Sequence, residues 1–342
     1  MKLTNIANGL ILVFGCVILL IFGKSLLFPF LFALLIYFLI RAIRRLIDRL
    51  PFIKNHIPSW VKNALSSFII FALLGFTGQM LVSNSQALIN SFSIYQGNID
   101  SIVAQINQLT GINVSQTITD KLSDVEIAKM VNPILNSVTG IMGNIMMVLF
   151  YLIFLFIEES NFKMKMHLIF SNPEKYTEIK VLLGNIEHSI THYIGLKTLI
   201  SFISATICFI TLFAFGVNSP LFWASLIFIM NFIPVIGALL AVILPSLFAM
   251  IQFGEMPYAL LIFFVLGTIQ TLILNLLEPK LMGDSLNISP LVALLSLAFW
   301  GAIWGITGMI VSVPITVIII ILLAHFERTR PIAILLSHQG KV

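Results

Sequence analysis

Charged side chains are scarce in this sequence, and their scarcity excludes a soluble globular fold. Aspartate, glutamate, lysine and arginine together make up 10% of the chain, whereas hydrophobic residues make up 59%. Soluble domains carry about a quarter charged residues. The composition therefore predicts an all-α, polytopic helical membrane protein.

Cysteine and the common catalytic motifs are also scarce. Cys16 and Cys208 both lie in apolar segments and are interpreted as buried small hydrophobic residues. The sequence has no Gly-x-x-x-x-Gly-Lys phosphate loop, no His-Glu-x-x-His motif and no Gly-x-Ser-x-Gly motif. His188 and His192 have the spacing of metal ligands, but their charged surroundings favour a solvated helix face. We expect no cofactor, metal or ATPase chemistry, and an intramembrane enzyme is the least favoured function.

Apolar segments of membrane-spanning length recur along the chain. About 20 helical residues cross the ~30 Å hydrocarbon layer. Suitable segments cover about 6–23, 25–40, 64–82, 138–157, 198–216 and 258–277. The first segment lacks a small-residue cleavage site and is expected to be retained as a span. With two longer apolar runs near the C-terminus, the pattern predicts about eight membrane segments.

Basic residues cluster in three stretches, and these orient the predicted spans. Six lie in 41–62, five in 158–197 and three in the C-terminal tail. The positive-inside rule places all three stretches, and with them both termini, in the cytoplasm. The net charge of +5 therefore reflects topology and contact with membrane lipids, and no nucleic-acid partner is expected.

Two uncharged runs of 35 residues, 220–254 and 290–324, fit neither one membrane crossing nor two. One straight helix of this length would measure ~52 Å, and two crossings need about 40 residues. Both runs follow a serine, are interrupted at mid-length, and carry a later proline, Pro245 or Pro314. Interrupted apolar segments in corresponding positions are typical of transporters. We expect two helical hairpins with tips near the midplane, related by an inverted repeat. Two long kinked helices are the alternative.

Five parts are predicted along the chain. They are spans with a basic interfacial helix (1–82), an extracytoplasmic helical excursion (83–137), a span with a cytoplasmic helical loop (138–197), a transport core (198–325) and a cytoplasmic tail (326–342). The interfacial helix is expected near 39–50, where apolar residues interleave with arginines. A structural cap, an oligomer contact and a receptor-like role all stay open for the excursion.

Polar and charged residues gather between the two uncharged runs. They are Asn275, Glu278, Lys280, Gly283, Asp284 and Ser289. Glu278 and Lys280 are close enough to neutralise each other, Gly283 permits a sharp reversal, and Ser289 can cap the helix that follows. The group forms either a well-built turn at the membrane surface or the lining and gate of a solute path.

Uncharged polar side chains are spread along the span that precedes this group. They are Thr268, Gln270, Thr271 and Asn275. Asn231 lies beside the interruption of the first uncharged run. Such groups suit a neutral, hydroxyl-rich solute better than a bare ion. Trp300 and Trp304 share one helical face in the second run, where aromatic packing is favoured over stacking against a sugar-like solute.

Motif-like stretches follow one another in order from about 228 to 316. They are Asn231-Phe-Ile-Pro-Val-Ile-Gly237, Asn275-Leu-Leu-Glu-Pro-Lys-Leu-Met-Gly283, Leu286-Asn-Ile-Ser-Pro-Leu291, Phe299-Trp-Gly-Ala-Ile-Trp-Gly305 and Gly308-Met-Ile-Val-Ser-Val-Pro-Ile-Thr316. In order and spacing these stretches resemble the autoinducer-2 exporter family of bacterial inner-membrane permeases. The layout of nearly the whole chain is similar, although the first 200 residues carry no comparable motif.

The resemblance implies export of a small furanose-like signalling solute by alternating access. Other members resemble sodium or lithium/proton antiporters, so antiport is the alternative function, and coupling to H⁺ or Na⁺ stays open. The resemblance also implies a homo-oligomer, with five copies expected, and an elevator-like motion. The residues expected to line or gate the path are Asn231, Pro234, Gly237, Gln270, Asn275, Glu278, Lys280, Gly283, Ser289, Trp300, Gly301, Trp304, Gly305, Gly308 and Pro314.

Overall fold

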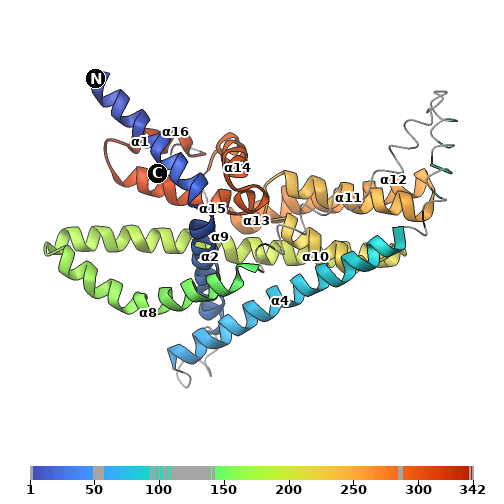
Figure 1. Cartoon of the computed structure of the whole chain (residues 1–342), viewed down its shortest axis with the longest axis horizontal. Coiled ribbons are helices and arrows are strands. Elements are labelled where there is room, and N and C mark those ends of the chain that lie inside the picture. The colour runs from blue at the N-terminus through green and yellow to red at the C-terminus, as the bar shows by residue number, and fades with distance from the viewer. Residues whose placement is uncertain are drawn as a thin grey trace. The chain divides into compact units, whose positions relative to one another are not determined.

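The computed structural model describes residues 3–48, 58–92, 143–283 and 288–338, with the single positions 95, 98, 101, 102, 105, 108, 140 and 340. Nearly all of these residues are helical (Figure 1), as the composition predicts. The sole strand-type pairing among them is an isolated bridge between Ile288 and Ser337. Most of the predicted excursion, the end of the predicted interfacial helix and Asp284 lie outside the described residues.

Six helices in the described part of the chain are long and apolar enough to cross a membrane. They are Lys24–Ile47, Trp60–Leu81, Pro173–Ala214, Ile236–Phe253, Met256–Met282 and Ile306–His325. Two other predicted spans form the helices α1 (Leu3–Phe22) and α8 (Ile145–Ile169), which are not among the six. The helical membrane fold is therefore confirmed, whereas the count of about eight segments stays a prediction.

Contacts divide the chain into two compact units, each built from segments that are far apart in the sequence. The first unit comprises Met1–Ser67, Gly140–Ile194 and Leu286–Val342, and the second comprises Phe68–Thr139 and Gly195–Ser285. Two long helices, α4 (Ser59–Phe92) and α9 (Pro173–Ala214), contribute to both units. The five-part organisation predicted from the sequence stays a prediction.

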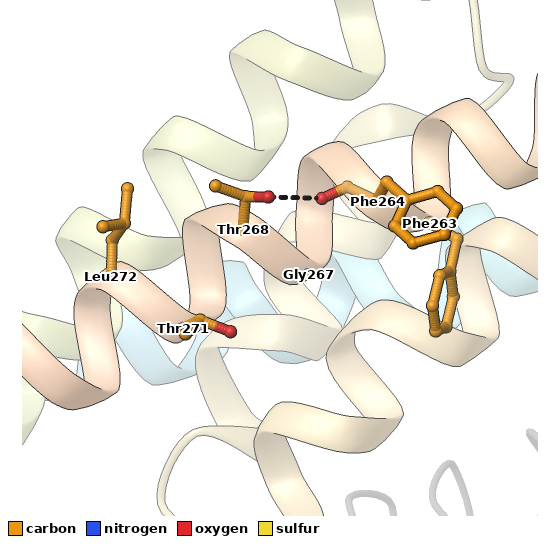
Figure 2. Close-up of a pocket in the computed structure, with 6 residues that line it drawn as sticks. All are labelled: Phe263, Phe264, Gly267, Thr268, Thr271 and Leu272. Atoms are coloured by element: carbon orange, nitrogen blue, oxygen red, sulfur yellow. Dashed lines mark hydrogen bonds between the residues drawn. The ribbon is translucent and has the colours of Figure 1, made fainter.

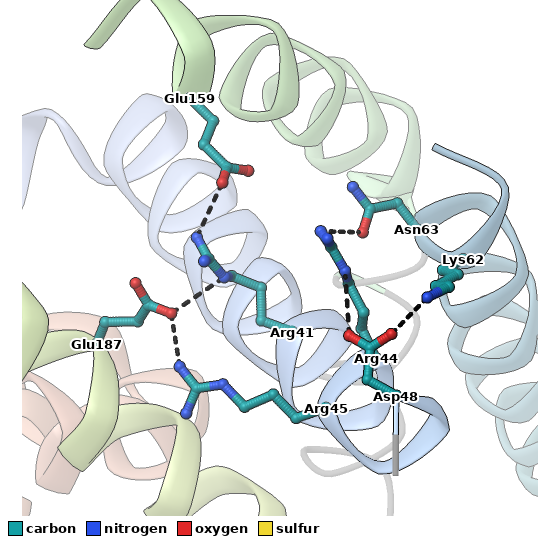
Figure 3. A network of polar contacts seen from close by, with 8 residues as sticks. All are labelled: Arg41, Arg44, Arg45, Asp48, Lys62, Asn63, Glu159 and Glu187. Atoms are coloured by element: carbon teal, nitrogen blue, oxygen red, sulfur yellow. Dashed lines mark hydrogen bonds and ion pairs between the residues drawn. The ribbon is translucent and has the colours of Figure 1, made fainter. Parts of the chain in front are cut away.

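In the first unit, α2 (Lys24–Ile47) packs against α8 and continues unbroken through Arg41, Arg44 and Arg45. Arg41 lies 3.2 Å from Glu159 and 3.1 Å from Glu187, and Arg45 lies 2.7 Å from Glu187. A second cluster consists of Arg44, Asp48, Lys62 and Asn63. Figure 3 shows these contacts joining α2 to α4, α8 and α9. Among the described residues, Arg41, Arg44 and Arg45 therefore lie on α2 and pair with carboxylates, and the predicted interfacial position of this stretch stays a prediction.

The second uncharged run folds back on itself in the first unit. Gly305, at a φ of 66°, separates α14 (Pro290–Trp304) from α15 (Ile306–His325), and this left-handed conformation favours glycine. The Ser296 hydroxyl lies 3.1 Å from the Ser312 carbonyl oxygen. In one continuous helix these residues would lie ~24 Å apart. The predicted hairpin is therefore confirmed, and α16 (Arg330–Leu336) then packs on α15.

The first uncharged run also folds into a hairpin, which we call the first hairpin and which lies in the second unit; the hairpin of α14 and α15 is the second hairpin. Residues 231–235 join α10 (Pro220–Met230) to α11 (Ile236–Phe253). The ring centroids of Trp223 and Phe248, from the two helices, lie 5.3 Å apart, so the run is folded and not extended. The inverted orientation of the two hairpins and the depth of their tips stay predictions.

The two hairpins share a packing feature beside their tips. A Cβ added to Gly237 would overlap with the carbonyl group of Met230, and a Cβ added to Gly308 would overlap with that of Trp300. In each hairpin the returning helix thus approaches the backbone of the first helix so closely that glycine is required. The predicted correspondence between the two runs therefore extends to their internal packing.

The second unit continues from α11 into a composite helix. The helix α12 (Met256–Leu272) packs against α11 and passes through a π-helix, η2 (Ile273–Leu277), into α13 (Glu278–Met282). Gly283, at a φ of 51°, ends this segment. The polar residues that the sequence places at the end of the span therefore lie on or directly after a widened helical turn.

Candidate functional site

A row of polar side chains connects α9 to the α12–α13 segment in the second unit. We call it the polar seam, and it comprises Lys197, Ser201, Ser204, Cys208, Gln270 and Glu278. Its four residues on α9 are spaced by four, three and four positions, so they share one helical face. Hydrogen bonds from both ends of this face reach α12 and α13, which places polar groups between two apolar helices.

An ion pair occupies one end of the polar seam. The Lys197 Nζ atom lies 2.6 Å from Glu278 Oε1, and the two side chains are 6% and 22% exposed. A pair this deeply placed is screened by salt much less than a surface pair. The sequence suggests Lys280 as the partner of Glu278, but Lys280 is exposed and the described partner is Lys197.

An amide and two small side chains occupy the other end. Gln270 Nε2 donates to Ser204 Oγ at 3.0 Å and lies 3.8 Å from Cys208 Sγ. All three residues are buried. Two buried atoms of the seam, Gln270 Oε1 and Ser201 Oγ, have no hydrogen-bond partner among the described residues. An unsatisfied buried polar atom costs about 1–3 kcal/mol. A guest that can form hydrogen bonds would therefore be stabilised beside these atoms.

The π-helix η2 determines how the two ends align. In a regular α-helix, residues eight positions apart, such as Gln270 and Glu278, differ by about 80° around the axis. The wider turns of Ile273–Leu277 reduce the rotation per residue and bring Glu278 closer to the face that carries Gln270. Both side chains then point toward α9. Single π-helical turns are frequent at functional sites.

A shallow hollow lies elsewhere along α12. Figure 2 shows its lining, which consists of Phe263, Phe264, Gly267, Thr268, Thr271 and Leu272. All six residues belong to this one helix, and the Thr268 hydroxyl donates to the Phe264 carbonyl oxygen at 2.8 Å. Thr268, Thr271 and Asn275 are exposed, whereas Gln270 is buried. Of the four uncharged polar residues predicted along this span, Gln270 is therefore the one that joins the polar seam.

The tip of the first hairpin holds three predicted path residues in the second unit. Asn231 ends α10 and is 9% exposed, and its Nδ2 atom has no hydrogen-bond partner in the described structure. Pro234 follows in the turn, and Gly237 packs on the backbone of α10. Val235, between them, has a φ of 60°, which is rare for a β-branched residue. Their part in a solute path stays a prediction.

The second hairpin holds a larger set of predicted residues in the first unit. The rings of Trp300 and Trp304 lie 5.0 Å apart, and Trp304 Nε1 donates to the Leu20 carbonyl oxygen at 3.0 Å. Trp304 is 1% exposed, so in this conformation it packs against α1 and presents no open face to a solute. The remaining predicted residues of this hairpin are Gly301, Gly305, Gly308 and Pro314.

Ser289 occupies the predicted N-cap position of α14, with Pro290 as the first helical residue. Its hydroxyl makes no capping hydrogen bond, and its backbone N–H donates instead to the Leu336 carbonyl oxygen at 3.1 Å. The predicted position is therefore confirmed, but the predicted cap bond is not formed.

Comparison with known proteins now identifies the family. Residues 10–328 match the family described as AI-2E family transporter. The chain belongs to the AI-2E transporter family. The resemblance in its C-terminal motifs is thus confirmed over nearly the whole length of the chain.

Curated relatives of this AI-2E family member are transport proteins. A putative transport protein of Borreliella burgdorferi is 34% identical over 255 residues, which cover 73% of this chain and 69% of that protein. The AI-2 transport protein TqsA of Escherichia coli is 28% identical over 328 residues, which cover 94% of this chain and 92% of TqsA. A putative transport protein of Haemophilus influenzae is 27% identical over 83% of each chain. These relatives and the apolar helices indicate a multi-pass membrane transporter.

The α9 half of the polar seam is the part of the candidate site that sequence reasoning missed. The sequence suggests Lys197 as a topology-setting charge and Cys208 as a small hydrophobic residue, yet both belong to the seam. The signal that could have found them is the single polar face formed with Ser201 and Ser204 in an otherwise apolar helix. No such signal exists for the π-helix.

Proposed function

We propose that this AI-2E family transporter moves a small, neutral, hydroxyl-rich solute of the furanose-like signalling class across the bacterial inner membrane by alternating access. The observation that carries this proposal is the pair of unsatisfied buried atoms in the polar seam, Gln270 Oε1 and Ser201 Oγ. Gln270 Oε1 can accept a hydrogen bond from a solute hydroxyl, and Ser201 can donate or accept one. The name of one relative, AI-2 transport protein, fits the same class of solute.

The charge balance of the polar seam also supports an uncharged solute. Lys197 and Glu278 neutralise each other at 2.6 Å, so the seam carries no net charge when both are ionised. A hydroxylated solute needs only hydrogen bonds there, whereas an ion would have to compete with the existing pair. Coupling of solute movement to H⁺ or Na⁺, and the antiport alternative, stay predictions.

Orientation and assembly follow from the sequence and the family resemblance. The three basic stretches support a multi-pass topology in the inner membrane with both termini in the cytoplasm. The resemblance supports a homo-oligomer of five copies. Labelling of the termini in intact and opened cells, and the mass of the purified protein in detergent, test these two parts.

Solute uptake by proteoliposomes tests the proposed function. Gln270→Leu keeps the side-chain volume similar but removes the hydrogen-bonding groups. We expect uptake of a labelled furanose-type solute to fall about tenfold, the factor that corresponds to one net hydrogen bond of about 1.4 kcal/mol. Thr268→Val is the matched control, because Thr268 lies on the same helix, is exposed and bonds to its own backbone. Equal uptake by Gln270→Leu and the wild-type protein would contradict the proposal.

A further inference from the structure

Glu278 presents a carboxylate at one end of the polar seam. Further along the seam lie the hydroxyls of Ser201 and Ser204 and the side-chain amide oxygen of Gln270. Carboxylate, hydroxyl and amide oxygens are the ligands that hard cations prefer. Without a positive partner, a carboxylate so placed would be stabilised by any small cation that reached it.

The ammonium group of Lys197 takes the place of that cation. It lies 2.6 Å from Glu278 Oε1, and the Lys197 side chain is only 6% exposed. Because the chain itself supplies the positive charge, the carboxylate is already neutralised before any solute enters. Removing one partner of a buried pair leaves an uncompensated buried charge, which is strongly unfavourable.

Few other charges are available to replace Lys197. In the described part of the second unit, the charged residues are Lys197, Glu255, Glu278 and Lys280. Lys280 is exposed and lies two positions after Glu278 on α13. It is therefore the one other basic side chain of this described unit that could approach the carboxylate.

We propose that Lys197 determines the solute selectivity of the transporter, because its ammonium occupies the cation position of the polar seam. The path then admits neutral hydroxylated solutes and excludes Na⁺ and other small cations. This inference rests on the proposed function, and it adds the residue that separates solute transport from cation transport. Lys197 acts through Glu278, because its ammonium neutralises the carboxylate. Replacing Lys197 leaves the carboxylate free to bind a cation, and we therefore expect a cation flux.

Na⁺ uptake by proteoliposomes tests the inference. Lys197→Met leaves Glu278 without its partner, and we expect radioactive Na⁺ uptake to rise on the order of tenfold above the wild-type level. Lys197→Arg keeps the positive charge and should give no rise. The double variant Lys197→Met/Glu278→Gln removes the carboxylate as well and should return Na⁺ uptake to the wild-type level. Size-exclusion chromatography of each variant shows whether it is folded, so a flux gained in one folded variant and lost in the next is assigned to the Glu278 carboxylate.

Two further variants keep the test decisive. Lys197→Gln removes the charge but can still donate a hydrogen bond to Glu278, so it serves if Lys197→Met does not fold. Lys197→Met/Lys280→Met also removes the other basic side chain in the described part of the second unit. Wild-type Na⁺ uptake in both variants, once size-exclusion chromatography shows that they are folded, would overturn the inference.

The outcomes also separate this inference from the proposed function. Solute uptake is measured in the same vesicles as Na⁺ uptake. If the wild-type protein moves no furanose-type solute while Lys197→Met gains Na⁺ uptake, the proposed solute is wrong and the role of Lys197 stands. If the wild-type protein moves the solute while no Lys197 variant gains Na⁺ uptake, the role of Lys197 is wrong and the solute stands.

Discussion

The hydroxyl of Ser296 lies 3.1 Å from the carbonyl oxygen of Ser312, sixteen residues further along the chain. Thr316 bonds to the same carbonyl at 2.8 Å and also contacts the Ser296 hydroxyl. All three residues are buried between α14 and α15. In lipid, apolar faces gain no hydrophobic advantage from meeting each other, so packing and interhelical hydrogen bonds decide how two helices associate. This cluster therefore fixes the register of the second hairpin.

Removing the Ser296 hydroxyl tests that role. We expect Ser296→Ala to lower the free energy of unfolding in detergent by about 0.6–1.7 kcal/mol, between the average and the largest values found for interhelical hydrogen bonds by double-mutant cycles in a helical membrane protein. Thermal unfolding of the purified protein measures the change. Thr206→Ala is the control, because Thr206 is exposed and bonds to a carbonyl of its own helix. Equal losses in the two variants would show that the cluster contributes no register-specific stability.

Gly308 gives a second prediction, about close packing. A Cβ at this position would overlap with the Trp300 carbonyl group, so Gly308→Ala should destabilise the protein by about 1–3 kcal/mol, as expected of overpacking. Gly184→Ala is the matched control in α9, since nothing lies within 4 Å of its added Cβ. Alanine is also the better helix former, so the control should be neutral or slightly stabilising. Unfolding midpoints in detergent measure both variants. Equal midpoints for Gly308→Ala and Gly184→Ala would contradict the close approach of Gly308 to the Trp300 backbone.

The polar seam contains a natural reporter of its opening. The chain has two cysteines, so Cys16→Ser leaves Cys208 as the single thiol. Cys208 is 0% exposed in the structure, and the hydrated thiolate is the nucleophile that reacts with thiol reagents. A charged methanethiosulfonate should therefore label it slowly, and a saturating transported solute should change the rate several-fold. Mass spectrometry of timed samples follows the labelling.

Cys208→Ser is the companion control for that experiment, because it leaves only the exposed Cys16. Its labelling should not respond to solute. A Cys208 labelling rate that is also indifferent to every transported solute would separate Cys208 from the path.

The ion-pair network of Figure 3 supports a fourth prediction. Glu187 accepts both Arg41 and Arg45, at 3.1 Å and 2.7 Å. The groups are partly exposed, so Glu187→Gln should cost on the order of 1 kcal/mol at low salt. The cost should shrink as ionic strength rises, since salt screens such pairs. Unfolding at two salt concentrations measures it, with the exposed Glu174→Gln as control. A loss that does not depend on salt would mean that packing, and not charge, is affected.

The hairpins could be predicted from the sequence because their causes are local. A run of 35 uncharged residues exceeds one crossing, and a glycine or proline at mid-length marks where a helix can break. Gly305 and Gly237 both lie at such breaks. The length of each run, its glycine and proline positions and the geometry of a helix were enough to predict where the chain reverses.

The polar seam could not be predicted in the same way, because its contacts are not local. Lys197 and Glu278 are 81 positions apart in the sequence. The residue spacing within either helix does not predict that these two side chains pair. Lys280 seemed the natural partner because it is close in sequence. The π-helix between Gln270 and Glu278 also changes which side chains share a face, and periodicity analysis assumes a regular α-helix.

The hydrogen bond from Trp304 to the Leu20 carbonyl links residues 284 positions apart. A ribosome adding about 5–20 residues per second would make Trp304 roughly a quarter of a minute to a minute after Leu20. During that interval α1 has been synthesised, but α14, which carries its partner Trp304, has not. Biogenesis of the first unit therefore ends only with the last part of translation. Nascent chains halted before residue 290 should leave their N-terminal helix accessible to insertase and quality-control protease alike.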